Sequence, residues 1–134
     1  MHVSAKNNGS VMLIAIFTIA LLSAIVIGML EMNTEELQLM RNQIHSVYAI
    51  AVAEAGLNDA FAEIRNDDTW TAGFTNEPFN GGSYTVTVAD SLPNLAVTST
   101  GTSSEGFVAR VEAEITVGPS SPYIIRIDEL RINE

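Results

Sequence analysis

The side chains that could do chemistry are few in this sequence, and their spacing assembles no catalytic site. There are two histidines and no cysteine, so thiol chemistry is excluded. His2 lies in a short polar stretch, and His45 falls on the polar side of an expected helix, where a solvated histidine is the simpler interpretation. Gly81 and Gly82 precede a strand rather than a helix, so they form no phosphate-binding loop. No serine has the glycine context of a nucleophile elbow.

Two acidic pairs are the remaining candidates. Asp67 and Asp68 could contribute to calcium binding, but adjacent aspartates where a helix gives way to a loop are ordinarily solvated. Glu112 and Glu114 lie two residues apart and share one face of an expected strand, which a solvent-facing sheet explains without a metal. No general acid–base pair follows from this spacing. We therefore expect no enzyme, no bound metal and no cofactor.

The element that sets the position of the other segments is a run of twenty apolar or near-apolar residues, Val11 to Leu30. As a helix it measures about 30 Å, which matches the hydrocarbon thickness of a bilayer. It is longer than the roughly 7–15 apolar residues of a secretory signal peptide, and Gly28-Met29-Leu30 is a poor cleavage site. We expect residues 10–30 to span a membrane, with Lys6 on the cytoplasmic side.

Residues 31–66 continue the helical pattern with no proline and one glycine, Gly56. Two apolar stripes follow three- and four-residue steps along this segment, on nearly opposite sides. The first stripe is Leu37, Met40, Ile44, Val47, Tyr48 and Ala51, and the second is Ile50, Ala53, Leu57, Ala60, Phe61 and Ile64. Either the helix packs against two partners, its own head and neighbouring subunits, or one stripe drifts or kinks around a single domain.

Residues 66–82 are dense in Asp, Asn, Gly and Pro, which predicts a loop. We expect its aromatic residues, Trp70, Phe74 and Phe79, to fold back onto the core. A carbohydrate or partner site is the alternative for these three rings.

From Ser83 onward the pattern alternates with period two, which predicts strands. Expected strands are 83–88, 95–100, 107–117 and 123–132, joined by short turns into an antiparallel meander. The last strand is expected at an edge, where its charged side chains discourage uncontrolled pairing. The apolar face of the sheet needs a cover, and the amphipathic helix is the candidate.

The charge composition argues against two classes of binding partner. The chain has 134 residues and a formal charge of −10, which disfavours nucleic acid and anionic lipid surfaces as partners. The expected fold is α+β, with a long N-terminal helix on a small antiparallel sheet. Residues 1–9 are a leader, 10–30 the membrane helix and 31–66 the amphipathic helix. Residues 67–134 supply the loop and sheet that complete a head with 31–66.

Several segments of this sequence together carry a family resemblance. They are Asn7 to Leu13 at the start of the apolar run, Tyr48 to Ala60 with its Ala-Glu-Ala-Gly-Leu core, Gly82 to Val88, and Val97 to Thr102. The chain resembles the type IV pilin and pseudopilin superfamily, whose members carry class III signal peptides. More narrowly, it is similar to the minor-pilin group named for PilX.

The resemblance implies a processing site and a set of partners. A prepilin peptidase would cut between Gly9 and Ser10 and methylate the new N-terminus at Ser10. The mature chain would wait in the inner membrane, N-terminus cytoplasmic, until an assembly platform extrudes it. It would then join other pilins or pseudopilins in an extracytoplasmic filament, a type IV pilus or a type II secretion pseudopilus.

Ile14 departs from the family pattern. Most pilins carry a glutamate at this position, five residues into the mature chain, thought to pair with the N-terminal amine of a neighbour. Its absence is typical of the K-type pseudopilin at the filament tip, so the resemblance implies an initiating or tip-located minor subunit. The alternative function is an uncleaved, membrane-anchored extracytoplasmic protein whose small sheet binds a ligand.

Overall fold

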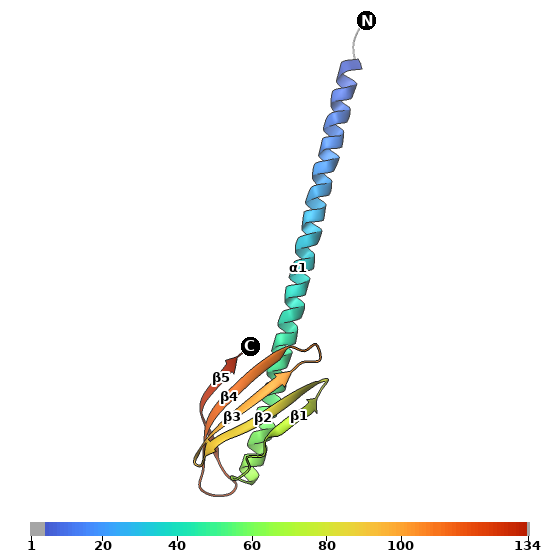
Figure 1. The fold of residues 1–134 in the computed structure, drawn as a ribbon. Helices are drawn as coiled ribbons and strands as arrows, with labels where there is room; N and C mark the ends of the chain where they lie inside the picture. Colours follow the sequence, from blue (N-terminus) through green and yellow to red (C-terminus); the bar gives the residue numbers. More distant parts are fainter. Residues whose placement is uncertain (1–4, 134) are drawn as a thin grey trace. The chain divides into compact units, whose positions relative to one another are not determined.

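The computed structural model describes residues 5–133 of the chain, and Met1 to Ser4 of the expected leader lie outside this range. It contains one helix and a five-stranded sheet (Figure 1). The elements are α1 (Ala5–Asn66), β1 (Phe74–Phe79), β2 (Gly82–Ser91), β3 (Asn94–Thr102), β4 (Val108–Val117) and β5 (Ile125–Asn133). The α+β fold class predicted from the sequence is confirmed.

The helix α1 is a single element of 62 residues. It begins at Ala5, inside the expected leader, and continues through Gly56 without interruption. The chain divides into two compact units, residues 1–41 and 42–134. The described residues of the first unit are the N-terminal part of α1, and those of the second, the head, are the rest of α1 and the sheet.

The five strands follow one another in the order β1-β2-β3-β4-β5, and each neighbouring pair is antiparallel. This is the meander predicted from the period-two pattern, with β5 at an edge as expected. Strands β2 and β3 are longer than predicted because pairing extends to the tight turn at Leu92-Pro93.

Strand β1 was not predicted, since residues 66–82 read as a loop. Phe74 to Phe79 pair with β2, although the register shifts between Phe74 and Glu77. The two strands are joined by Asn80 and Gly81, whose φ angles are 47° and 90°. Positive φ at both central residues defines the tight hairpin turn that Asn-Gly favours, so this dipeptide was the overlooked signal.

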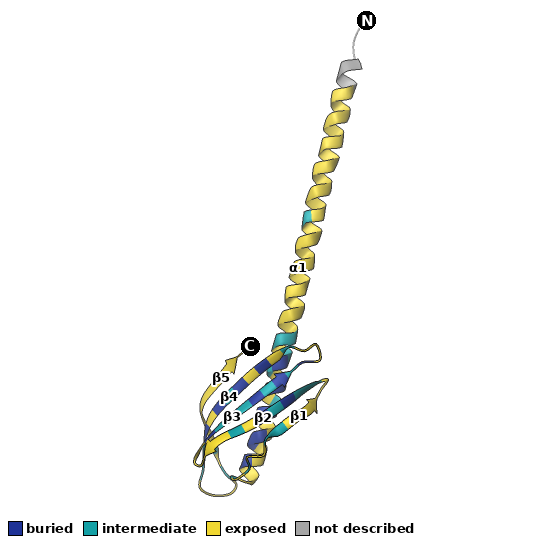
Figure 2. Cartoon of the chain, in the orientation of Figure 1, coloured by how far each residue is buried: buried dark blue, intermediate teal, exposed yellow. Residues whose placement is uncertain are grey.

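The core lies between one face of α1 and the sheet, as predicted. In β4 the side chains alternate, with Ala109, Val111, Ala113 and Ile115 buried. Figure 2 shows the same alternation along β3 and β4, and the buried part of α1 behind them. The helical residues of the core are Val52, Ala53, Leu57, Ala60, Phe61 and Ile64.

The loop aromatics divide into two groups. Trp70 and Phe74 pack against the core, as expected, with their rings 5.2 Å apart. For Phe79 the expectation was wrong, because its side chain is 42% exposed at the tip of the β1–β2 hairpin.

Candidate functional site

The expected processing site lies on the exposed surface of α1. Gly9 and Ser10 are helical and exposed. A Cβ added to Gly9 would meet no atom within 4 Å, so the fold of the chain does not itself require glycine there. Ile14 is 63% exposed on the same helix.

Within the described residues, no other part of the chain buries the apolar segment that follows. Its large apolar side chains between Val11 and Leu30 are 48% to 71% exposed. Two hydroxyls within it bond back to the helix, since Thr18 donates to the Ile14 carbonyl and Ser23 to the Ile19 carbonyl, both at 2.8 Å. Such bonds remove the cost of a free hydroxyl in hydrocarbon. This one helix is long and apolar enough to cross a membrane.

The two apolar stripes of α1 differ in solvent exposure. The second stripe is buried against the sheet, apart from Ile50, which is half-buried. In the first stripe Ile44 and Val47 are 63% and 59% exposed, and Ala51 is exposed as well. One domain therefore does not cover both stripes, which rules out the single drifting stripe and leaves an open apolar face on the head's own helix.

Tyr48 in the first stripe and His45 beside it contact other residues of the head. The Tyr48 hydroxyl donates a hydrogen bond to the carbonyl of Asn80 at the β1–β2 turn. His45 is half-buried and stacks on Phe107, with ring centroids 5.6 Å apart and planes 18° apart. The sequence predicted a solvated His45 on the polar side of the helix, and the structure shows it half-buried because Phe107 lies over its ring.

Asp67 has a local structural role at the end of α1. Its carboxylate accepts hydrogen bonds from the Thr69 amide at 2.9 Å and from the Thr69 hydroxyl at 2.6 Å. The hydroxyl bond, then the amide bond, lowers the pKa of Asp67 below its ordinary value. Across the described residues 5–133, no group of three or more His, Cys, Asp or Glu side chains could hold a metal ion.

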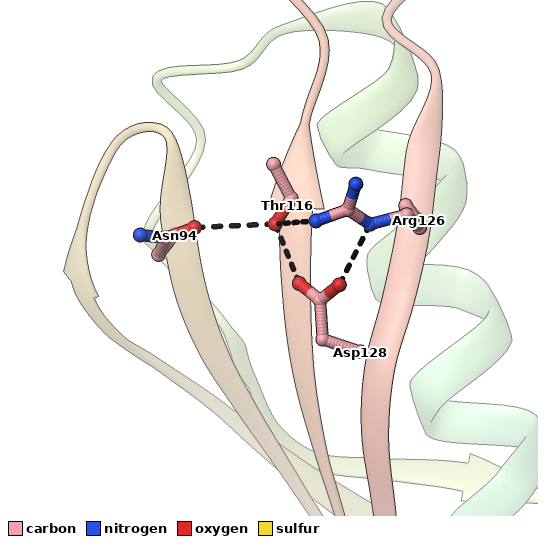
Figure 3. Close-up of polar contacts among 4 residues, drawn as sticks. All are labelled: Asn94, Thr116, Arg126 and Asp128. Atoms are coloured by element: carbon pink, nitrogen blue, oxygen red, sulfur yellow. Dashed lines mark hydrogen bonds and ion pairs between the residues drawn. The ribbon is translucent and has the colours of Figure 1, made fainter.

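A polar network ties three strands together on the solvent-facing side of the sheet (Figure 3). The Thr116 hydroxyl donates to Asp128 and lies 3.1 Å from Oδ1 of Asn94. Arg126 donates from Nε to the other Asp128 oxygen at 2.7 Å. The Thr116 hydroxyl and then Arg126 hold the pKa of Asp128 below its usual range.

The acidic pair of β4 takes part in ion pairs on the same face. Glu112 lies 2.8 Å from Arg110, and Glu114 lies 3.7 Å from Arg131, which also binds Glu129 at 2.7 Å. The hydrogen bond from Arg131 lowers the pKa of Glu129. These charges are paired with one another rather than gathered for catalysis.

A shallow hollow lies over this charged face. Its volume is about 110 Å³, and Thr98, Glu112, Glu129 and Arg131 are among its lining residues. Small-molecule sites ordinarily measure about 300–1,000 Å³, so this hollow is smaller than such a site, whereas an open depression near Leu92 and Pro93 on the same head measures about 370 Å³.

The contact between α1 and β2 includes one strong polar pair. The Tyr84 hydroxyl donates a hydrogen bond to the carboxylate of Asp59. Burial, followed by this bond and the Asp59 charge, raises the pKa of Tyr84 to about 12. The pair fastens the middle of the head's helix to the second strand.

No family model, curated protein or solved structure matches the chain. The class of this protein therefore has to be argued from its own residues and geometry.

Proposed function

We propose that this chain is a structural, pilin-like minor subunit that primes or decorates a type IV pilus or a type II secretion pseudopilus. The observation that carries the proposal is the continuity of α1. One uninterrupted helix contains both an uncharged segment of bilayer length and the face that packs on the head's sheet. A cleavable signal peptide or a flexibly tethered anchor does not require this continuity.

The exposure of the apolar side chains supports the same function. Every large apolar side chain from Val11 to Leu30 is at least 48% exposed, so the segment needs an apolar environment supplied from outside the chain. A bilayer supplies it before assembly, and the equivalent helices of neighbouring subunits supply it in a filament. The proposed location is therefore the inner membrane first and an extracytoplasmic filament afterwards.

The minor role rests on Ile14. A glutamate there would place a buried charge that needs a partner, and a chain with isoleucine cannot form that pair. We propose that this chain occupies an initiating or tip position, where no neighbour requires the pair. Its partners are other pilin-like subunits, the prepilin peptidase and the inner-membrane assembly platform.

The test is the chemical state of the N-terminus in cells that carry a prepilin peptidase. Mass spectrometry of the native protein is expected to show a chain that starts at N-methylated Ser10. An intact leader from Met1 to Gly9 in wild-type cells would contradict the proposal and favour the uncleaved anchor. A peptidase-deficient strain is the control, and there the leader is expected to remain.

A further inference from the structure

Helix α1 encloses the peptide bond of the proposed cleavage site. The helix begins at Ala5, so the bond between Gly9 and Ser10 belongs to its second turn, and both residues are exposed. In an α-helix the Gly9 carbonyl accepts a hydrogen bond from the amide of Leu13. The Ser10 amide likewise donates to the carbonyl of Lys6. The polar groups on both sides of this bond are therefore engaged within the helix.

Hydrolysis of this bond requires the local helix to open. Water adds its hydroxyl to the Gly9 carbonyl carbon, the bond to the Ser10 nitrogen breaks, and that nitrogen takes up the remaining proton. The carbonyl carbon becomes tetrahedral on the way, and its negative oxygen needs hydrogen-bond donors from the peptidase. A carbonyl that is bonded within a helical turn is not free to receive them, so the segment has to leave the helix before it is cut.

The residues around the bond hold this part of the helix weakly. Residues 7–10 are Asn, Asn, Gly and Ser, which all rank below alanine in helix propensity, and glycine loses the most backbone freedom in a helix. Gly9 gains no packing in return, because a Cβ at this position would meet no atom within 4 Å. The first four amides of a helix also have no partner within it, so few hydrogen bonds resist the opening.

The apolar run sets the point at which the opening stops. Its large apolar side chains, from Val11 to Leu30, are exposed along the whole run, and under the proposed function a bilayer surrounds them. Backbone groups freed in hydrocarbon find no water to bind, so unwinding is strongly disfavoured there. The opening is therefore confined to the residues before Val11, and the bond between Gly9 and Ser10 lies at its end.

Ser10 is suited to begin the helix that remains. Serine is among the preferred N-cap residues, whose side-chain oxygen accepts a hydrogen bond from the amide two or three residues later. For Ser10 these are the amides of Met12 and Leu13, which lose their carbonyl partners when the first turn opens. An N-cap residue has a non-helical backbone, so the bond between Gly9 and Ser10 lies outside the shortened helix.

We propose that α1 has two start points, Ala5 and Ser10, and that the peptidase cuts the form that starts at Ser10. The residues Asn7 and Asn8 keep the first turn weak, and the Ser10 hydroxyl caps the shorter helix. Ser10 is thus a positioning residue, which exposes the bond on its N-terminal side through the backbone that it caps. The inference rests on the proposed function, because it concerns how the same cleavage site becomes accessible.

Processing rates in cells that carry a prepilin peptidase test the role of Ser10. Loss of an N-cap makes the shortened helix several-fold less populated, so Ser10→Ala is expected to be cut several-fold more slowly than the wild type. Ser10→Asn keeps a capping side chain and is expected to be cut at close to the wild-type rate. A peptidase pocket that selects small residues gives the opposite order. That order, or equal rates for the two variants, would refute the capping role.

The weak first turn is tested at positions 7 and 8, with Gly9 and Ser10 left unchanged. The double variant Asn7→Ala, Asn8→Ala is expected to be cut about threefold to tenfold more slowly, because alanine strengthens the turn. The matched control is Asn7→Ser, Asn8→Ser, which is close to alanine in size but has a lower helix propensity. Its rate is expected to stay within about twofold of the wild type.

Amide hydrogen exchange gives a second measurement that does not depend on cutting. Full-length chain from a peptidase-deficient strain is placed in bicelles, where the amides of Gly9 and Ser10 are expected to exchange much faster than that of Ile14. The double alanine variant should slow them. Equal protection at Gly9 and Ile14 in the wild type would refute the opening.

The two kinds of failure are distinguishable in these experiments. A wild-type chain that the peptidase never cuts refutes the proposed function, and the exchange rates still decide whether α1 opens before Ser10. A wild-type chain that is cut, with equal rates for the double alanine and double serine variants, refutes the inference and leaves the proposed function in place.

Discussion

Gly101 on β3 lies directly against the backbone of Ala53 on α1. A Cβ added to Gly101 would lie 2.3 Å from the Ala53 nitrogen and 2.4 Å from the Ala49 carbonyl oxygen, far inside van der Waals contact. Ala49 and Ala53 are themselves fully buried. Helix and sheet thus meet here backbone to backbone, and small residues on both sides make that separation possible.

Replacing Gly101 by alanine is expected to destabilise the head. The added methyl group collides with backbone atoms, which cannot rotate away, and overpacking of this kind costs about 1–3 kcal/mol. Urea unfolding of the full-length protein in detergent can be followed by the fluorescence of Trp70, the single tryptophan. Gly118→Ala is the matched control, since its Cβ would meet nothing closer than 3.4 Å. Equal unfolding midpoints for the two variants would contradict the close approach.

The pair of Tyr84 and Asp59 predicts an alkaline loss of stability. The pKa of Tyr84 is raised from its ordinary value of 10.0 to about 12, so the folded chain holds the phenolic proton more tightly than the unfolded chain. The stability that this provides is complete below pH 10 and is lost as the pH rises through about 12. Wild-type protein is therefore expected to lose more stability than Tyr84→Phe between pH 9 and pH 11.

The measurement for Tyr84 is the urea midpoint, followed by circular dichroism at both pH values. At pH 9, Tyr84→Phe is expected to have a lower urea midpoint than the wild type, because the bond to Asp59 is gone. Between pH 9 and pH 11, its urea midpoint is expected to fall less than that of the wild type. An unchanged alkaline slope in Tyr84→Phe would show that the phenol does not titrate in this way.

Thr116 is expected to control the acidity of Asp128. Its hydroxyl is the largest cause of the lowered pKa, so Thr116→Val should move the pKa of Asp128 up toward its ordinary value. Because the pKa is lowered on folding, the associated stability is present above the ordinary value and is lost as the pH falls through the folded value. A carboxyl ¹³C NMR titration measures the shift, with Thr98→Val as the control. A pKa that stays low in Thr116→Val would assign the effect to Arg126 instead.

Gly9→Leu is expected to block processing without disturbing the fold. The position is exposed and has no atom near an added Cβ, so the helix can accept the larger residue, and any effect reports on recognition by the peptidase. Gly28→Leu is the control, since that glycine of the same helix also has no atom within 4 Å. Immunoblots should show the longer, uncut chain for Gly9→Leu alone. Equal processing of both variants would count against Gly9-Ser10 as the cleavage site.

If the proposed minor role holds, Ile14→Glu is expected to raise the number of copies of this chain in each filament. Under the proposed function, the glutamate would supply a charge that can pair with a neighbour's N-terminal amine, and a buried charge with its partner present becomes tolerable. The number of copies in sheared filaments, measured by quantitative immunoblot, should rise. Ile14→Gln, of similar size and without charge, should leave the number unchanged. An equal number for Ile14 and Ile14→Glu would remove the basis for the minor role.

Local periodicity explains which parts of the fold were predictable. The change from a helical period to a period of two separates α1 from the sheet, and the alternation in β4 identifies its buried side correctly. Such signals depend on neighbouring residues alone. Strand β1 lacks them, because its residues Asn76 and Pro78 break the alternation and its order comes from pairing with β2.

The features of the candidate site also separate into those set by the local sequence and those set by tertiary contacts. The sequence by itself determined the length and uncharged character of the apolar run, the position of Gly9 and Ser10, the isoleucine at 14 and the existence of two stripes on one helix. Only the tertiary structure decided which stripe the head buries, that Phe107 covers His45, and that the aliphatic side chains of β5 stay exposed. These depend on how wide a sheet one helix can cover and on contacts between residues far apart in the chain, and neither leaves a local pattern.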